Sequence, residues 1–157
     1  MFGLFKKKHK LLSPFSGKCV PLNEVPDEAF AQKLLGDGIA IIPSDGKLVS
    51  PVDCTVEQVF DTKHAYSLKD SNGLEILIHI GINTVELNGE GFDNRVTNTQ
   101  QVKSGDLLSN VDLKFISEKG YSIYTPVVFI NHDKFNFEFN FGPVVAGKSE
   151  IAIYESK

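Results

Sequence analysis

Two histidines, His64 and His79, lie at the two ends of a segment that reads as a β-hairpin. Alternation in its second arm puts His79 on the face away from the isoleucines. A two-residue loop at Ser71-Asn72 would set the histidines directly opposite, with Cβ atoms about 4.5 to 5.5 Å apart. A loop at Asn72-Gly73 would make them diagonal neighbours about 7 to 8 Å apart, and a three-residue loop would separate them onto opposite faces.

Facing imidazoles suit phosphoryl transfer better than metal binding. Structural zinc takes four ligands and catalytic zinc usually three, and the further candidates here are distant acids and His132. In phosphoryl transfer a neutral ring nitrogen attacks phosphorus while its neighbour donates an N–H, and a pKa near 6.5 keeps the nucleophile unprotonated. From the pattern alone, a surface histidine pair without a task remains the alternative. We expect His132 to be a loop residue and His9 to belong to a basic tail.

Composition excludes several functional classes. Residues 11–157 hold 12 basic and 20 acidic residues, an acidic balance that argues against nucleic acid as a partner. The sequence has neither a glycine-rich nucleotide loop nor a hydrolase nucleophile motif. Cys19 and Cys54 form no C-x-x-C pair, which favours a reducing cytosol and two buried small hydrophobes.

The chain reads as one all-β domain. Short apolar runs alternate with turn signals, and Phe135 to Phe141 alternates strictly, so we expect its four phenylalanines to face the core. Short peripheral helices are predicted from Asp27 to Leu35 and from Leu113 to Lys119. Ser13-Pro14 matches Ser50-Pro51, and this faint repeat predicts two similar halves around one core, an antiparallel sandwich or barrel.

The first ten residues read as a separate basic tail before a single domain over residues 11–157. Phe2, Leu4 and Phe5 stand beside four lysines, and this combination could rest weakly on an anionic membrane surface. A solvated tail is the alternative. A secretory signal would place its charges before a longer apolar core, so we expect a free-standing cytoplasmic protein, in contact with the inner membrane face at most.

The sequence resembles the glucose-type IIA proteins of the bacterial phosphoenolpyruvate-dependent sugar phosphotransferase system. The resemblance covers about residues 11 to 155. The stretches that carry it are Leu35-Gly36-Asp37-Gly38-Ile39-Ala40, Ser50-Pro51-Val52-Asp53, Thr62-Lys63-His64-Ala65-Tyr66, His79-Ile80-Gly81-Ile82-Asn83-Thr84-Val85, Leu87-Asn88-Gly89-Glu90-Gly91-Phe92 and Val102-Lys103-Ser104-Gly105-Asp106.

This resemblance implies an antiparallel β-sandwich, the duplicated hybrid barrel, and a site without a bound cofactor or metal. It makes His79 the residue that accepts a phosphoryl group from the phosphocarrier protein HPr and passes it to a cysteine of a IIB domain. His64 would steady the phosphoryl group, with Thr62 as its hydrogen-bonding neighbour. Phe60, Tyr66 and Leu77 are expected to form a shallow apolar docking face that excludes water.

The chain departs from the family pattern at two positions. Asn83 stands where the family usually has Asp, so a negative charge near the phosphoryl group is lost and partner docking and transfer rates are affected. Cys54 replaces a glycine that is common in the repeat, which bears on local turn geometry alone.

Two other functions are weighed against the relay. A regulatory binding module on the same fold would control metabolic enzymes or transporters through its phosphorylation state. A zinc peptidase of the related hybrid-barrel group would need an H-x-H pair, which the chain does not have.

Overall fold

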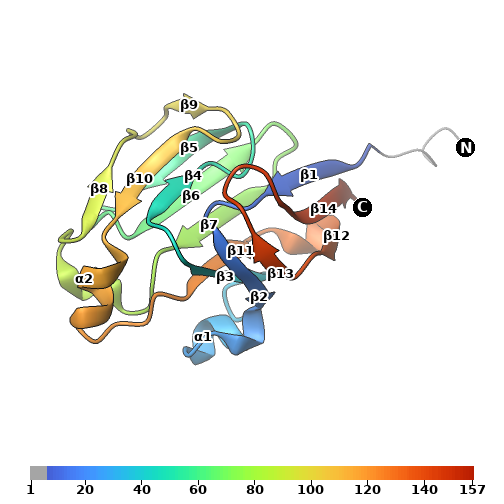
Figure 1. The fold of residues 1–157 in the computed structure, drawn as a ribbon. Coiled ribbons are helices and arrows are strands. Elements are labelled where there is room, and N and C mark those ends of the chain that lie inside the picture. The colour runs from blue at the N-terminus through green and yellow to red at the C-terminus, as the bar shows by residue number, and fades with distance from the viewer. Residues whose placement is uncertain (1–6) are drawn as a thin grey trace, which may run out of the picture.

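Antiparallel sheets form the framework of the computed structural model, which describes residues 7–157 (Figure 1). The expected all-β fold is confirmed. An eight-stranded sheet is flanked by two three-stranded sheets. The large sheet has the order β13 (Gly142–Val144), β2 (Gly17–Pro21), β3 (Asp37–Pro43), β11 (Thr125–Phe129), β7 (Glu75–His79), β6 (Ala65–Asp70), β5 (Cys54–Val59), β9 (Gln101–Val102). The small sheets are β1 (His9–Leu12), β14 (Glu150–Ser156), β12 (Phe135–Phe139), and β4 (Lys47–Val49), β10 (Leu107–Val111), β8 (Phe92–Asn94).

The two Ser-Pro segments are buried at their serines and make equivalent hydrogen bonds. Ser13 Oγ donates to the carbonyl two residues on at 2.6 Å, and Ser50 Oγ does the same at 2.7 Å. Each segment also accepts a backbone hydrogen bond from the residue just before the other segment: Leu12 N–H donates to Pro51 O, and Val49 N–H donates to Pro14 O, both at 2.9 Å. The sequence repeat therefore corresponds to two halves that interlock reciprocally.

Both predicted helices are present and both are short. The helix α2 (Leu113–Glu118) agrees with the expected bounds within one residue, and Asp112 caps it. The helix α1 (Glu28–Ala31) is capped by Asp27 but ends four residues before the expected Leu35. A 3-10 helix, η2 (Leu22–Glu24), precedes it. The prediction extends the helix to Leu35 because Gly36 is expected to end it, whereas Lys33 already has a left-handed φ of 61°.

Two apolar clusters lie on opposite faces of the large sheet. The main core fills the space between the sheets and includes the fully buried Tyr66, Phe129 and Tyr154. The smaller cluster gathers Phe30 of α1 with residues of β2, β3 and β11, and Leu77 of β7 packs against it. The short helix α1 therefore covers the outer face of the large sheet next to β7.

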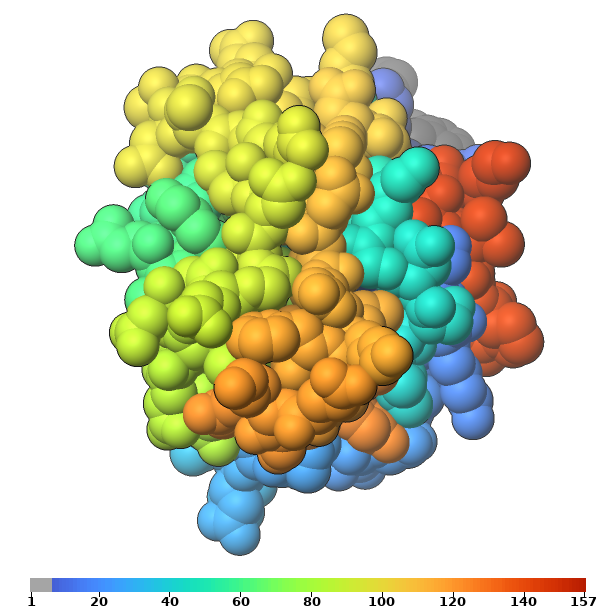
Figure 2. All heavy atoms as spheres, turned by 60° about the vertical axis from the view of Figure 1, so that its left-hand side comes forward, coloured from blue at the N-terminus to red at the C-terminus, as the bar shows by residue number. Residues whose placement is uncertain are grey.

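The helix α2 and the segment after it lie against residues that follow β7 in the chain. Figure 2 shows residues 113–123, in orange, against the yellow-green residues 84–92, which include the 3-10 helix η3 (Thr84–Leu87). Asp112 N–H donates to Gly91 O at 2.8 Å, and Tyr121 Oη donates to Glu86 at 2.9 Å. These bonds hold the segment that follows His79 in place.

The four alternating phenylalanines of residues 135–141 are only partly buried in the core. Phe135 is buried and Phe137 and Phe139 are half-buried, but Phe141 is 52% exposed because it lies beyond the end of β12. The expectation that all four rings face the core is wrong for Phe141.

Part of the expected tail lies outside the described residues. Membrane contact was predicted for residues 1–10, of which 1–6 are not described, while His9 and Lys10 belong to β1. Among residues 7–157 there is no helix with the length and hydropathy needed to cross a membrane.

Asp70 ties the hairpin tip to the last strand. This buried carboxylate accepts hydrogen bonds from Asn72 N–H and Leu74 N–H, both at 2.9 Å, and from Tyr154 Oη. We predict that Asp70→Ala lowers the free energy of unfolding by about 3 kcal/mol, because it leaves three donors without an acceptor. Urea unfolding measures the change. Asp106→Ala, which removes one exposed bond to Lys103 N–H, should cost less than about 1 kcal/mol, and equal losses in both variants would contradict the prediction.

Candidate active site

The rings of His64 and His79 meet edge to face at one end of the β6–β7 hairpin. Their centroids are 4.9 Å apart and their planes make an angle of 82°. His79 is the last residue of β7, between β6 and β11 in the large sheet, and His64 immediately precedes β6. The structure therefore brings together the two residues that the sequence singled out.

The hairpin register differs from both registers that favoured this pairing. His79 is paired with Ala65, and residues 71–73 form a three-residue loop, the case expected to separate the histidines. The pairing survives because His64 lies outside β6, so strand alternation does not fix its side chain. Lys63 before it has a left-handed φ of 59°, and Ile80 N–H donates to His64 O at 2.7 Å.

Both rings use Nδ1 for a local hydrogen bond. His79 Nδ1 lies 2.7 Å from Gly81 O. Since a carbonyl oxygen can only accept, Nδ1 carries the proton, and in the neutral ring Nε2 keeps its lone pair. His64 Nδ1 lies 2.6 Å from Thr62 Oγ1, which can donate or accept. Thr62 is thus placed where the resemblance implied.

Gly81 has no room for a side chain. Its φ is 74°, and a Cβ there would lie 2.7 Å from Thr84 Cγ2 and 2.8 Å from Ser122 O. Only glycine adopts this left-handed position without strain while the chain packs so closely. The carbonyl that orients His79 is therefore held by a position that excludes other residues.

Burial keeps both imidazoles neutral. Burial, together with the neighbouring His79, lowers the pKa of His64 to about 4. Burial also lowers the pKa of His79, against the opposing effects of the Gly81 carbonyl and the charge of Asp27. At neutral pH the site therefore presents an unprotonated nitrogen beside a second uncharged ring.

Apolar side chains surround the histidine pair. Phe30 of α1 lies 5.1 Å from the His79 ring and Phe60 lies edge-on to His64 at 5.7 Å, measured between centroids. Leu77 shares the His79 face of β7 and is half-buried. The sequence did not identify Phe30 and Asp27 as site residues. Pro26-Asp27 predicts the start of a helix, but nothing in the sequence indicates which strand that helix covers.

Tyr66 does not belong to this face, contrary to expectation. It is paired with Ile78, is fully buried in the main core, and donates from Oη to Asn94 Oδ1 at 2.7 Å. The three-residue loop moves it to the opposite face from His79. A partner protein cannot contact Tyr66 without unfolding the sheet.

Asn83 is exposed and begins η3 with a left-handed φ of 62°. Its side chain makes no capping bond there. Asparagine tolerates this conformation better than most residues, so the position has a local backbone role besides any contact with a partner.

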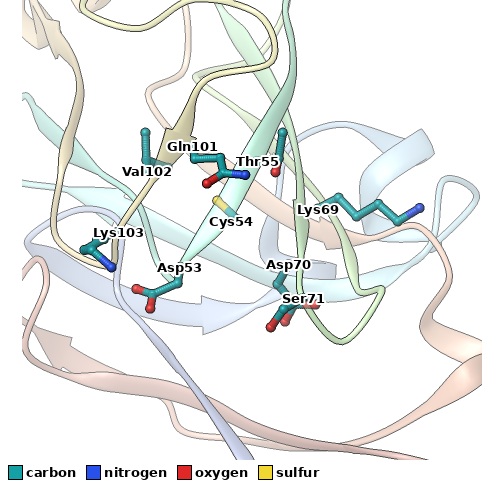
Figure 3. A pocket seen from close by; sticks show the side chains of 9 residues that line it. All are labelled: Asp53, Cys54, Thr55, Lys69, Asp70, Ser71, Gln101, Val102 and Lys103. Carbon is teal, nitrogen blue, oxygen red and sulfur yellow. The ribbon is translucent and has the colours of Figure 1, made fainter.

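No group of three metal-binding side chains occurs within the described range 7–157, and the histidine pair alone offers two ligands. A cavity of about 440 Å³ lies elsewhere, at the ends of β5, β6 and β9 (Figure 3). Its lining includes Asp53, Cys54 and Gln101 but neither histidine.

Comparison with known proteins agrees with this geometry. A sequence model of the phosphoenolpyruvate-dependent sugar phosphotransferase system, EIIA 1, matches residues 9–135. The solved glucose permease IIA from Mycoplasma capricolum superposes with a TM-score of 0.91 at 40% identity, over 96% of this chain and 97% of that one.

Curated relatives include whole chains of similar length. The PTS system glucose-specific EIIA component of Bacillus cereus is 47% identical over 85% of this chain and 82% of its own. The component of the same name from Buchnera aphidicola is 42% identical over 92% of this chain and 91% of its own. The PTS system glucose-specific EIICBA component of Staphylococcus saprophyticus is 49% identical over 77% of this chain, which spans only 18% of that longer relative.

The sandwich architecture, the facing histidines and these matches together support a phosphoryl-relay role and do not favour the regulatory alternative. The chain therefore belongs to the EIIA 1 family of phosphotransferases of the phosphoenolpyruvate-dependent sugar phosphotransferase system.

Proposed function

We propose that His79 Nε2 accepts a phosphoryl group from phosphorylated HPr and passes it to a cysteine of a IIB domain. In the first step an Nε2–P bond forms as the bond to the HPr leaving atom breaks, and in the second a S–P bond forms as Nε2–P breaks. The observation that carries the proposal is the donation of His79 Nδ1–H to Gly81 O, which leaves the Nε2 lone pair free for attack.

His64 supports the phosphoryl group without being the acceptor. If Thr62 Oγ1–H donates to His64 Nδ1, the neutral ring carries its proton on Nε2 and can donate it to a phosphoryl oxygen. Such a donor becomes more effective when a docked partner excludes water from the site. His64 is 5% exposed, so its ring is already largely dry.

The acceptor occupies a rigid position. β7 is hydrogen-bonded on both sides, to β6 and to β11, and the residues after His79 are fixed by Ile82 N–H donating to Ser122 O at 3.0 Å. In-line transfer between two proteins needs the attacking atom at a defined place, and a central strand supplies it.

The docking face comprises the apolar side chains around the pair. Phe60 and Leu77 are half-buried, and Val85 is 48% exposed close to Asn83. The uncharged Asn83 amide would not repel the phosphoryl group. A small apolar face of this kind favours weak, short-lived complexes, which a relay with two successive partners needs.

The partners and location follow from the same proposal. Relatives named EIICBA components join the A part to B and C parts in one chain, which supports a IIB domain as the receiver. We infer that the chain acts as a single cytoplasmic domain whose first strand, β1, begins at His9, with the residues before it making weak contact with an anionic membrane surface.

Replacing the acceptor should abolish labelling. We predict that His79→Gln takes up no phosphoryl group from phosphoenolpyruvate through enzyme I and HPr, because glutamine lacks the attacking nitrogen. His64→Gln should still be labelled but pass the group on about 100-fold more slowly, since the flexible glutamine amide lacks the ring nitrogen that Thr62 Oγ1 contacts and so does not hold an N–H toward the transferring group. The measurement is acid-labile, base-stable label on the chain and its loss to a IIB domain.

His132→Gln is the matched control, because His132 is exposed and outside the site. It should behave as wild type in both steps. Label retained in His79→Gln, or lost equally in His132→Gln, would refute the assignment of the acceptor.

The lowered pKa of His64 predicts a pH-dependent stability. The folded chain holds this ring neutral down to about pH 4, whereas the unfolded chain protonates it below about 6.5. Stability from this group is therefore complete above pH 6.5 and is lost as the pH falls toward 4, by up to about 3 kcal/mol. Urea unfolding of wild type and His64→Gln from pH 7.5 to 4 measures it. A constant difference between the two across that range would contradict the prediction.

A further inference from the structure

The phenylalanine strand has a gradient of exposure that the relay does not explain. Along β12 the rings pass from buried Phe135 to half-buried Phe137 and Phe139, and Phe141 beyond its end is 52% exposed. Phe137 and Phe139 stack on each other, with centroids 5.6 Å apart, and both stack on Phe129 of β11. An ordered row of aromatic rings thus reaches the surface along one strand.

Within residues 7–157, no strand pairs with the outer side of β12. β12 pairs with β14 on one side and is the last strand of its sheet. Asn140 N–H donates to Ile151 O and Lys157 N–H to Lys134 O, so the even-numbered residues bond to β14. Because main-chain groups of successive residues point to alternate sides of a strand, those of Phe137 and Phe139 point away from β14, where another strand could pair.

We propose that two copies of this chain associate by pairing their β12 strands antiparallel across a two-fold axis at Asn136. The three-stranded sheets of the two copies would then join into one six-stranded sheet. Phe137 of each chain would lie opposite Phe135 of the other and donate its N–H to that residue's carbonyl. The Phe135 N–H is not free, since it already donates to His132 O.

Charge selects this register. Only registers centred on residues 136, 137 or 138 keep the rings of both strands together on one face along β12. Centring on 138 places two Glu138 carboxylates directly opposite, and centring on 137 pairs no opposite charges. Centring on Asn136 places Lys134 of each chain opposite Glu138 of the other, twice. Lys134 is the last residue of the 3-10 helix η4 (His132–Lys134), directly before β12, and its carbonyl accepts from Lys157 N–H in continuation of the ladder with β14. Cross-strand opposite charges stabilise a pair and like charges destabilise it.

Both charged side chains are available for this contact. Lys134 and Glu138 are exposed, and neither takes part in the ion pairs formed within residues 7–157. The paired segment is short and gives few main-chain bonds, so the dimer should be weak, with a Kd of roughly 10⁻⁴ M.

Sedimentation equilibrium of the full chain over a range of concentrations tests the association. The apparent mass should rise from 17.3 kDa toward twice that value. Glu138→Lys or Lys134→Glu alone should weaken the dimer at least tenfold, because each sets like charges opposite, and the double exchange should restore it. The matched control is the same exchange at Lys114 and Glu118 of α2, an exposed pair on another face.

Cross-linking tests the register. Asn136→Cys should form a disulfide-linked dimer under mild oxidation, because the two-fold axis brings that residue against its own copy at about 4.5 Å between Cα atoms. Asn140→Cys, on the same face of the chain but away from the axis, should not. The native Cys19 and Cys54 are buried, so we expect little cross-linking through them, and wild type measures that background.

A constant mass of 17.3 kDa at every concentration would overturn the proposal. A dimer indifferent to both charge reversals would place the interface elsewhere, and faster cross-linking at Asn140→Cys than at Asn136→Cys would exclude the register. None of these results depends on phosphorylation, so they leave the relay at His79 to be judged separately.

Discussion

The hydrogen bond from His79 Nδ1 to Gly81 O is the constraint on which the site depends. A neutral imidazole has two tautomers, and only one of them leaves Nε2 as a nucleophile. The bond selects that tautomer with a backbone oxygen, which cannot titrate or rotate away. The remaining features either hold this carbonyl in place or keep the ring uncharged.

The carbonyl is held by contacts made with distant parts of the chain. Gly81 turns through a left-handed conformation against Thr84 and Ser122, which leaves no space for a larger residue. Ser122 belongs to the segment that leads from α2 into β11. Gly81 and Ser122, which are far apart in the sequence, thus jointly define where the His79 proton lies, and the ring of Phe30 from α1 packs against the His79 ring.

Much of the architecture could be predicted from the sequence, and the errors have specific causes. Turn signals, the Asp112 cap and the Ser-Pro repeat identified the class of fold, one helix and the two-halved arrangement, all of which depend on local preference. The histidine pair was found, but with the wrong register, because the turn-forming residues Ser71, Asn72 and Gly73 are compatible with loops of two or three residues. That one-residue difference moved Tyr66 into the core.

Tertiary features account for the other failures. Phe30 beside His79 is invisible in the sequence, since nothing local tells which strand a short helix will cover. Phe141 continues the alternation of β12 in sequence but not in space, because the strand ends at Phe139. Periodicity reports which side chains share a face and carries no information about how far the opposing layer extends.

The pairing of β1 with β14 joins residues 9–12 to residues 150–156. Closing this sheet requires nearly the whole chain to exist, and the reciprocal bonds between the two Ser-Pro segments join residues about forty positions apart. Such a topology has a high contact order, which slows folding. During synthesis the first strand must therefore wait on the ribosome unpaired, and it carries Lys10 as a solubilising charge through that interval.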